Sequence, residues 1–91
     1  MNLQDIRMEI DGIDDRIIAL LADRSAFVTA AGLLKKDEQG VRDSKRVEQV
    51  IDRVKMRAVK AGLDPGIAEQ VYRTIIACFI NKELKEQIRE S

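Results

Sequence analysis

Apolar residues recur every three or four positions through most of the first 36 residues, which is the period of an α-helix that buries one face. These positions are Leu3, Ile6, Ile10, Ile13, Ile17, Leu20, Leu21, Val28, Ala31 and Leu34. No proline interrupts the stretch, and its two glycines are tolerable within a helix. The pattern therefore predicts one helix over about residues 3–36, on the order of 50 Å long.

Two shorter helices are predicted after this rod. Residues 37–42 break the apolar period and predict a loop. Asp43 or the serine after it can cap a second helix, and Gly62 is a typical residue for its C-terminal end. Pro65, preceded by an aspartate, is typical of the first turn of a third helix. The sequence thus predicts an all-α fold of three helices in a single domain over residues 1–91.

The length of the first helix indicates a second chain. Folded domains of about this size are only marginally stable alone, and aromatic residues, the largest core-filling side chains, make up 3% of the sequence. Two shorter helices cannot cover a rod of this length. We therefore expect an intertwined helical homodimer.

Composition and charge exclude several classes of function. Lysine plus arginine and aspartate plus glutamate both number 16, so no net basic charge attracts nucleic acid or an anionic membrane. Histidine is absent and Cys78 is the single cysteine, which argues against a metal site and an internal disulfide. No signal peptide or membrane span is visible. The expected location is cytoplasmic, with no cofactor.

Charged residues occupy positions where a helical core would be apolar. On the first helix, Arg24 and Lys35 lie about 20° apart near the centre of the apolar stripe. Glu83 lies on the apolar face of the third helix, and Asp43 and Arg46 lie near the start of the second. Inward charges are costly unless they are paired or bind a ligand. Since cations outnumber acids in this set, the sequence predicts a small anionic ligand that carries carboxylates.

Arg7 lies on the flank of the same stripe, 17 residues before Arg24. On a straight helix the two residues are about 25 Å apart, too far for one small ligand. If Arg7 belongs to the site, it must come from a second protomer. A two-fold dimer with antiparallel long helices would then form two equivalent sites.

Taken together, these residues form a recognisable set. The set comprises Ile6-Arg7, Ile10-Asp11, Ile13-Asp14, Ile17, Leu20-Leu21, Arg24, Gly32, Lys35, Val41-Arg42-Asp43, Arg46, Gly62-Leu63-Asp64, Tyr72 and Ile75-Ile76. It resembles the all-helical (AroQ-class) chorismate mutases along essentially the whole chain. The resemblance implies rearrangement of chorismate to prephenate, in aromatic amino acid or related secondary metabolism, with neither metal nor cofactor.

The resemblance also implies roles for single residues. Arg7 would reach across the dimer to one substrate carboxylate, and Arg24 would hold a carboxylate from its own chain. Lys35 would donate to the ether oxygen of the breaking bond. Arg46 would help to hold the compact substrate conformer, and Asp43 would accept from the substrate hydroxyl.

Three positions depart from the best-known mutase pattern. Val47 stands where a glutamate is common, Phe79 where a small serine is common, and Glu83 where glutamine would be a second donor to the ether oxygen. Val47 after an arginine, and an aromatic at position 79, are more similar to the isochorismate pyruvate-lyase branch, which forms salicylate. Asp43 is more similar to the mutases. A 4-amino-4-deoxychorismate mutase is a third alternative, since carboxylates could contact an amine.

Glu83 leads to a hypothesis about pH. An ionised carboxylate cannot donate a hydrogen bond to the ether oxygen, whereas a protonated one can. We expect activity to increase toward acid pH and Glu83→Gln to flatten that dependence. The alternative is a Glu83–Lys35 salt bridge without a catalytic role.

Two non-enzymatic functions stay open at this point. A helical dimerisation module is disfavoured because charges such as Arg24, Lys35 and Glu83 lie on the apolar faces. A relative that binds a chorismate-like ligand without converting it remains an alternative, because Val47 and Glu83 depart from the mutase pattern.

Overall fold

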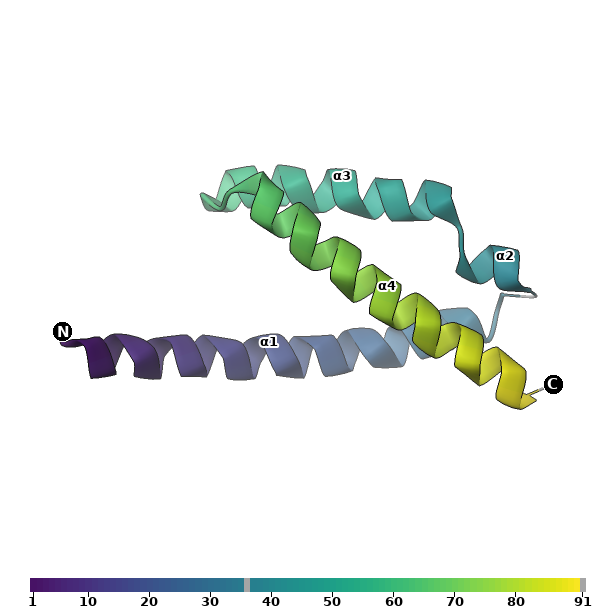
Figure 1. Cartoon of the computed structure of the whole chain (residues 1–91), viewed down its shortest axis with the longest axis horizontal. Coiled ribbons are helices and arrows are strands. Elements are labelled where there is room, and N and C mark those ends of the chain that lie inside the picture. Colours follow the sequence, from purple (N-terminus) through teal and green to yellow (C-terminus); the bar gives the residue numbers. More distant parts are fainter. Residues whose placement is uncertain (36, 91) are drawn as a thin grey trace.

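The computed structural model describes residues 1–35 and 37–90, with residues 39, 89 and 90 described by their backbone alone. Every secondary-structure element within these residues is an α-helix, and short turns connect the helices (Figure 1). The elements are α1 (Leu3–Gly32), α2 (Glu38–Val41), α3 (Ser44–Ala61) and α4 (Pro65–Glu90). The predicted all-α fold of one long helix and two shorter ones is confirmed, although α4 is nearly as long as α1, and α2 is an additional single turn.

The first helix begins where the sequence supplies a reciprocal cap. The Asn2 side chain accepts from the Asp5 backbone N–H at 2.8 Å, and the Asp5 carboxylate accepts from the Asn2 N–H at 3.2 Å. At the other end, the Leu34 and Lys35 N–H groups donate to carbonyls three residues back instead of four. This tightened turn ends α1 at Gly32, so the predicted end near residue 36 was too late.

The loop predicted over residues 37–42 was wrong for its central part, which forms α2. Asp37 caps this turn by accepting from the Gly40 N–H at 2.9 Å, and Arg42 pairs with Glu38 at 2.8 Å. Val41 is buried, with 4% of its surface exposed. A local cap and one buried side chain are therefore enough to order a segment whose polar composition is typical of a loop.

The connections around α3 agree with the predictions. The Asp43 carboxylate accepts from the Arg46 N–H at 3.1 Å and caps α3. Gly62 ends the helix in the left-handed conformation, with φ of 78°, which favours glycine. The next helix, α4, begins at Pro65 as expected.

The core lies mainly where α4 meets α3 and α2. Its buried apolar residues are Val41, Ile51, Ala58, Ala68 and Ile76. α4 runs diagonally from the far end of α3 to the C-terminal part of α1 and contacts all three other helices (Figure 1). All four helices therefore converge at one end of the molecule.

The N-terminal half of α1 projects away from this core (Figure 1). Residues 1–20 are all exposed, including the stripe that contains Ile6, Ile10, Ile13 and Ile17. The radius of gyration is 16.0 Å, whereas a compact chain of this length has about 12 Å. Among the described residues, no helix is sufficiently long and apolar to cross a membrane.

Candidate active site

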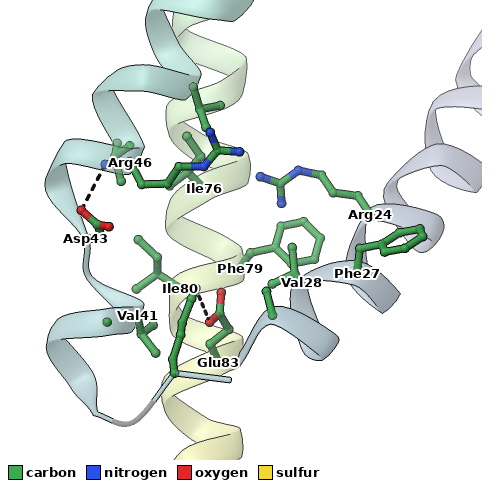
Figure 2. Close-up of a pocket in the computed structure, with 15 residues that line it drawn as sticks. Arg24, Phe27, Val28, Val41, Asp43, Arg46, Ile76, Phe79, Ile80 and Glu83 are labelled. Carbon is green, nitrogen blue, oxygen red and sulfur yellow. Dashed lines mark hydrogen bonds and ion pairs between the residues drawn. The ribbon is translucent and has the colours of Figure 1, made fainter. Parts of the chain in front are cut away.

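A cavity of about 330 Å³ opens where the four helices converge (Figure 2). Seven of the eight predicted site residues line it: Arg24, Lys35, Asp43, Arg46, Val47, Phe79 and Glu83. The remaining wall is mostly apolar and comprises Phe27, Val28, Ala31, Gly40, Val41, Val50, Ile76 and Ile80. The fold therefore gathers charges from distant parts of the chain around one small space.

Arg24 gives the clearest indication that the cavity can bind an anion. Its Nη1 atom is buried and has no hydrogen-bond partner within the described part of the chain. The guanidinium carbon lies 4.8 Å from the centre of the Phe79 ring, a cation–π arrangement that holds the group in place. An unpaired buried donor costs about 1–3 kcal/mol, and more when it is charged. Arg46 points toward Arg24 across the cavity (Figure 2), so two guanidinium groups face one space.

Lys35 and Glu83 form an ion pair in the wall of the cavity. Lys35 Nζ lies 3.0 Å from Glu83 Oε2, although the residues are 48 positions apart in the sequence. Glu83 is buried, with 6% exposed, while 30% of the Lys35 side chain is exposed. An ammonium has three donors, so this bond leaves Lys35 able to donate to a ligand as well. The contact itself fits both the catalytic interpretation and the salt-bridge alternative.

The start of α3 fixes two further groups. Because the Asp43 carboxylate accepts from the Arg46 backbone N–H, the cap that begins the helix also sets both side chains at the cavity edge. Both residues are exposed in the single chain. A carboxylate offers about four lone-pair sites, so Asp43 can cap the helix and still accept from a ligand hydroxyl.

Comparison with known proteins adds the family. The sequence model of the chorismate mutase type II family matches residues 6–84, which include all eight predicted site residues. The chain belongs to the chorismate mutase type II family. It is also similar to the chorismate mutase of Methanocaldococcus jannaschii, with 28% identity over 90 residues that cover 97% of this chain and 88% of that relative. The family recognised from the sequence is thus confirmed.

Two of the positions that depart from the best-known chorismate mutase pattern, Val47 and Phe79, are apolar, and both line the cavity. Val47 contributes no polar group, and the ring of Phe79 lies against the Arg24 guanidinium. Phe79 therefore combines a steric limit on the ligand with an interaction that orients a cation.

Arg7 is the one predicted site residue that does not line the cavity. It lies on the exposed N-terminal half of α1, away from the convergence of the helices (Figure 1). Its participation stays a prediction that requires a second chain.

Sequence reasoning missed parts of the wall. Phe27 lies at the edge of the apolar stripe, about 20° from Leu20 and Leu34, and was overlooked. Gly40 lies in the predicted loop, where no helical pattern pointed inward. Val41 was the available signal, because a single apolar residue within a polar segment often anchors it to the core.

A second charged cluster lies on the outside of α3 and α4 and serves a different purpose. Arg73 pairs with Glu48 at 3.2 Å and Glu69 at 2.9 Å, and Lys55 lies 3.5 Å from Glu69. The hydrogen bond from Arg73 and the charge of Lys55 lower the pKa of the Glu69 carboxyl. Glu48 and Glu69 raise the pKa of Arg73. These groups are on the surface and fasten the two helices together.

Proposed function

We propose that this protein is a chorismate mutase, an isomerase that rearranges chorismate to prephenate. The observation that carries the proposal is the buried Arg24 Nη1 atom, which has no hydrogen-bond partner among the described residues and faces a cavity that a second guanidinium and an ammonium also line. Membership of the chorismate mutase type II family and similarity to a chorismate mutase along most of the chain support the same reaction.

The proposed catalysis needs positioning and electrostatics only. Chorismate carries two carboxylates and reacts from a compact conformer in one pericyclic step. Arg24 and Arg46 would bind carboxylate and hold this conformer, which lowers the entropic part of the barrier. A cavity of about 330 Å³ lies in the range of small-molecule sites.

The charge that develops in the transition state lies on the ether oxygen, whose bond to carbon breaks as a carbon–carbon bond forms. Lys35 would donate to this oxygen while it keeps its bond to Glu83. Glu83 would add a second donor only in its protonated form. Asp43 would accept from the substrate hydroxyl and so select the ring orientation.

We further propose that the active form is a homodimer in which each cavity receives Arg7 from the partner. The accessible surface of the chain is 7329 Å², whereas a compact folded chain of 10.3 kDa exposes about 5,400 Å². The excess of about 1,900 Å² per chain is the amount that an obligate homodimer interface covers on each subunit. Much of it lies on α1, where the isoleucine stripe is uncovered.

Two related substrates are the alternatives. Val47 and Phe79 in the cavity wall favour isochorismate, from which pyruvate would be eliminated to leave salicylate. Asp43 and Glu83 in the same wall could bind the amine of 4-amino-4-deoxychorismate.

We further propose that the protein is cytoplasmic, because its free thiol, Cys78, suits a reducing compartment.

The test is an assay of the purified protein with chorismate, isochorismate and 4-amino-4-deoxychorismate side by side. We expect prephenate from chorismate, with kcat/KM reduced about 10²–10³-fold by Arg24→Ala. Arg53→Ala removes an exposed arginine of α3 that does not line the cavity, and serves as the matched control. Salicylate from isochorismate would replace the mutase proposal with the lyase. No product from any substrate would leave a ligand-binding relative.

A further inference from the structure

Gly40 lies against the stem of the cavity lysine. A Cβ atom placed on Gly40 would lie 3.3 Å from Lys35 Cβ and 3.5 Å from Lys35 Cγ. The separation of 3.5 Å is ordinary van der Waals contact, but that of 3.3 Å is tighter, so one of the two segments would have to move by a few tenths of an ångström. Lys35 Cβ is joined directly to the backbone, so it cannot swing aside as the end of a long side chain would.

The backbone of Gly40 does not itself require glycine. Among the described residues, Gly62 alone adopts a positive φ, so alanine fits the conformation at position 40. Glycine within a helix is also less favourable than alanine by about 1 kcal/mol. The absence of a side chain at this position is therefore explained by packing, and the closest atoms belong to Lys35.

Neither segment can retreat freely from this contact. Asp37 caps α2 through the Gly40 N–H, and Gln87 Nε2 of α4 donates to the Asp37 carbonyl at 3.4 Å. Val41, the next residue, is buried in the core. On the other side, the ammonium of Lys35 is bonded to buried Glu83. Lys35 is thus held between the backbone of α2 and a carboxylate of α4.

We propose that Gly40 is a positioning residue that sets where the Lys35 ammonium stands in the cavity. The catalytic consequence rests on the proposed function, in which Lys35 donates to the ether oxygen. A small displacement of a catalytic hydrogen-bond donor can remove much of the rate enhancement that the donor provides. Gly40→Ala moves the lysine stem, and the donor then meets the ether oxygen with poorer geometry while α2 itself gains a better helix former.

The test is Gly40→Ala, with Gly12→Ala as a matched control, because a Cβ on Gly12 meets nothing within 4 Å in the single chain and position 12 lies about 130° around α1 from the isoleucine stripe that a partner would cover. We expect Gly40→Ala to lower kcat about ten-fold with KM changed less than two-fold and no decrease in Tm. In a Lys35→Gln background, Gly40→Ala should have no further effect on kcat. If Gly40 had a purely structural role, Gly40→Ala would lower Tm and activity together, and its effect on kcat would persist in the Lys35→Gln background. That result, or an unchanged kcat, would overturn the proposal.

A second readout does not depend on turnover. The side-chain ammonium signal of Lys35, assigned in ¹⁵N-labelled protein by its loss in Lys35→Gln, should shift or broaden in Gly40→Ala and stay unchanged in Gly12→Ala. If the parent protein converts none of the three substrates, the proposed function fails and this signal alone decides the role of Gly40. An unchanged signal means that Gly40 does not position Lys35.

Discussion

The two halves of α1 continue one helix and one apolar period, yet they meet opposite surroundings. The C-terminal half packs on α4 and brings Arg24 to the cavity, and Lys35 follows three residues after the end of the helix. In the N-terminal half, every residue up to position 20 is exposed, although Ile10, Ile13 and Ile17 continue the same stripe. An apolar period therefore predicts that a helix will bury a face, but not which chain covers it.

The charged residues follow the same division. Those in the covered region already form a partly built anion site within one chain, whereas Arg7 lies on the exposed region without access to that cavity. If the uncovered half is the dimer interface, then assembly and the completion of the site are a single event. Each half of α1 can be tested by substitutions that leave the other half unchanged.

The largest effect is expected from a charge on the uncovered stripe. In a two-fold dimer, Ile10→Asp would place one buried carboxylate from each protomer in the interface, and neither would have a charged partner. We expect dissociation to a monomer by sedimentation, loss of activity, and a decrease in Tm on the order of 10 °C or more. Met8→Asp is the control, because Met8 is exposed to a similar extent but lies about 200° away around the helix. Equal behaviour of the two variants, or a monomeric parent, would contradict the dimer.

The next effect tests whether one site takes residues from two chains. Arg7→Ala and Arg24→Ala should each inactivate the homodimer. Mixing equal amounts after unfolding and refolding should restore about a quarter of the parent activity, because half of the dimers are hybrids and each hybrid has one intact site. If Arg7 and Arg24 served the same cavity from one chain, every site in the mixture would lack one arginine and activity would stay lost.

A smaller effect is expected at Glu83, within the covered half. A glutamine at position 83 can donate to the ether oxygen, whereas an ionised carboxylate can only accept. We therefore expect Glu83→Gln to raise kcat/KM for chorismate about ten-fold or more at pH 7.5, measured for both proteins side by side. An equal or lower kcat/KM would favour a structural ion pair with Lys35, whose geometry is already present at 3.0 Å.

The smallest effect is expected on the outer surface of α3 and α4. Arg73 and Lys55 lower the pKa of Glu69 in the folded chain, so the ionised form stabilises the fold. This contribution is present above the ordinary value of 4.5 and is lost as the pH falls through the lowered pKa. Glu69→Gln should therefore lower Tm slightly at pH 7 but not in strong acid. Thermal melts at both pH values measure this difference, with Glu9→Gln as the control. A difference that persists in acid would mean that packing, not charge, is responsible.

Much of the fold follows from local signals in the sequence. Helix bounds near Asp43, Gly62 and Pro65 were predictable because caps and stops act through hydrogen bonds within a few residues. The turn of α2 was not, because the burial of its single valine depends on the helix that packs beside it, and α2 contacts α4. The end of α1 was not, because the cap at its tightened turn is Leu33, which is not a residue typical of a helix end.

The amino-acid pattern alone was sufficient to show that this chain is all-α, that cations lie on apolar helix faces, and that the chain resembles the chorismate mutases. Helical periodicity and the cost of unpaired charge are properties of neighbouring residues, and they can be read along one dimension. Only the folded chain shows that Lys35 pairs with Glu83 across 48 positions, that Phe79 lies against Arg24, and that the stem of Lys35 borders the place where a Cβ atom on Gly40 would lie. These contacts depend on the angle at which α4 crosses the other helices, which no local pattern specifies.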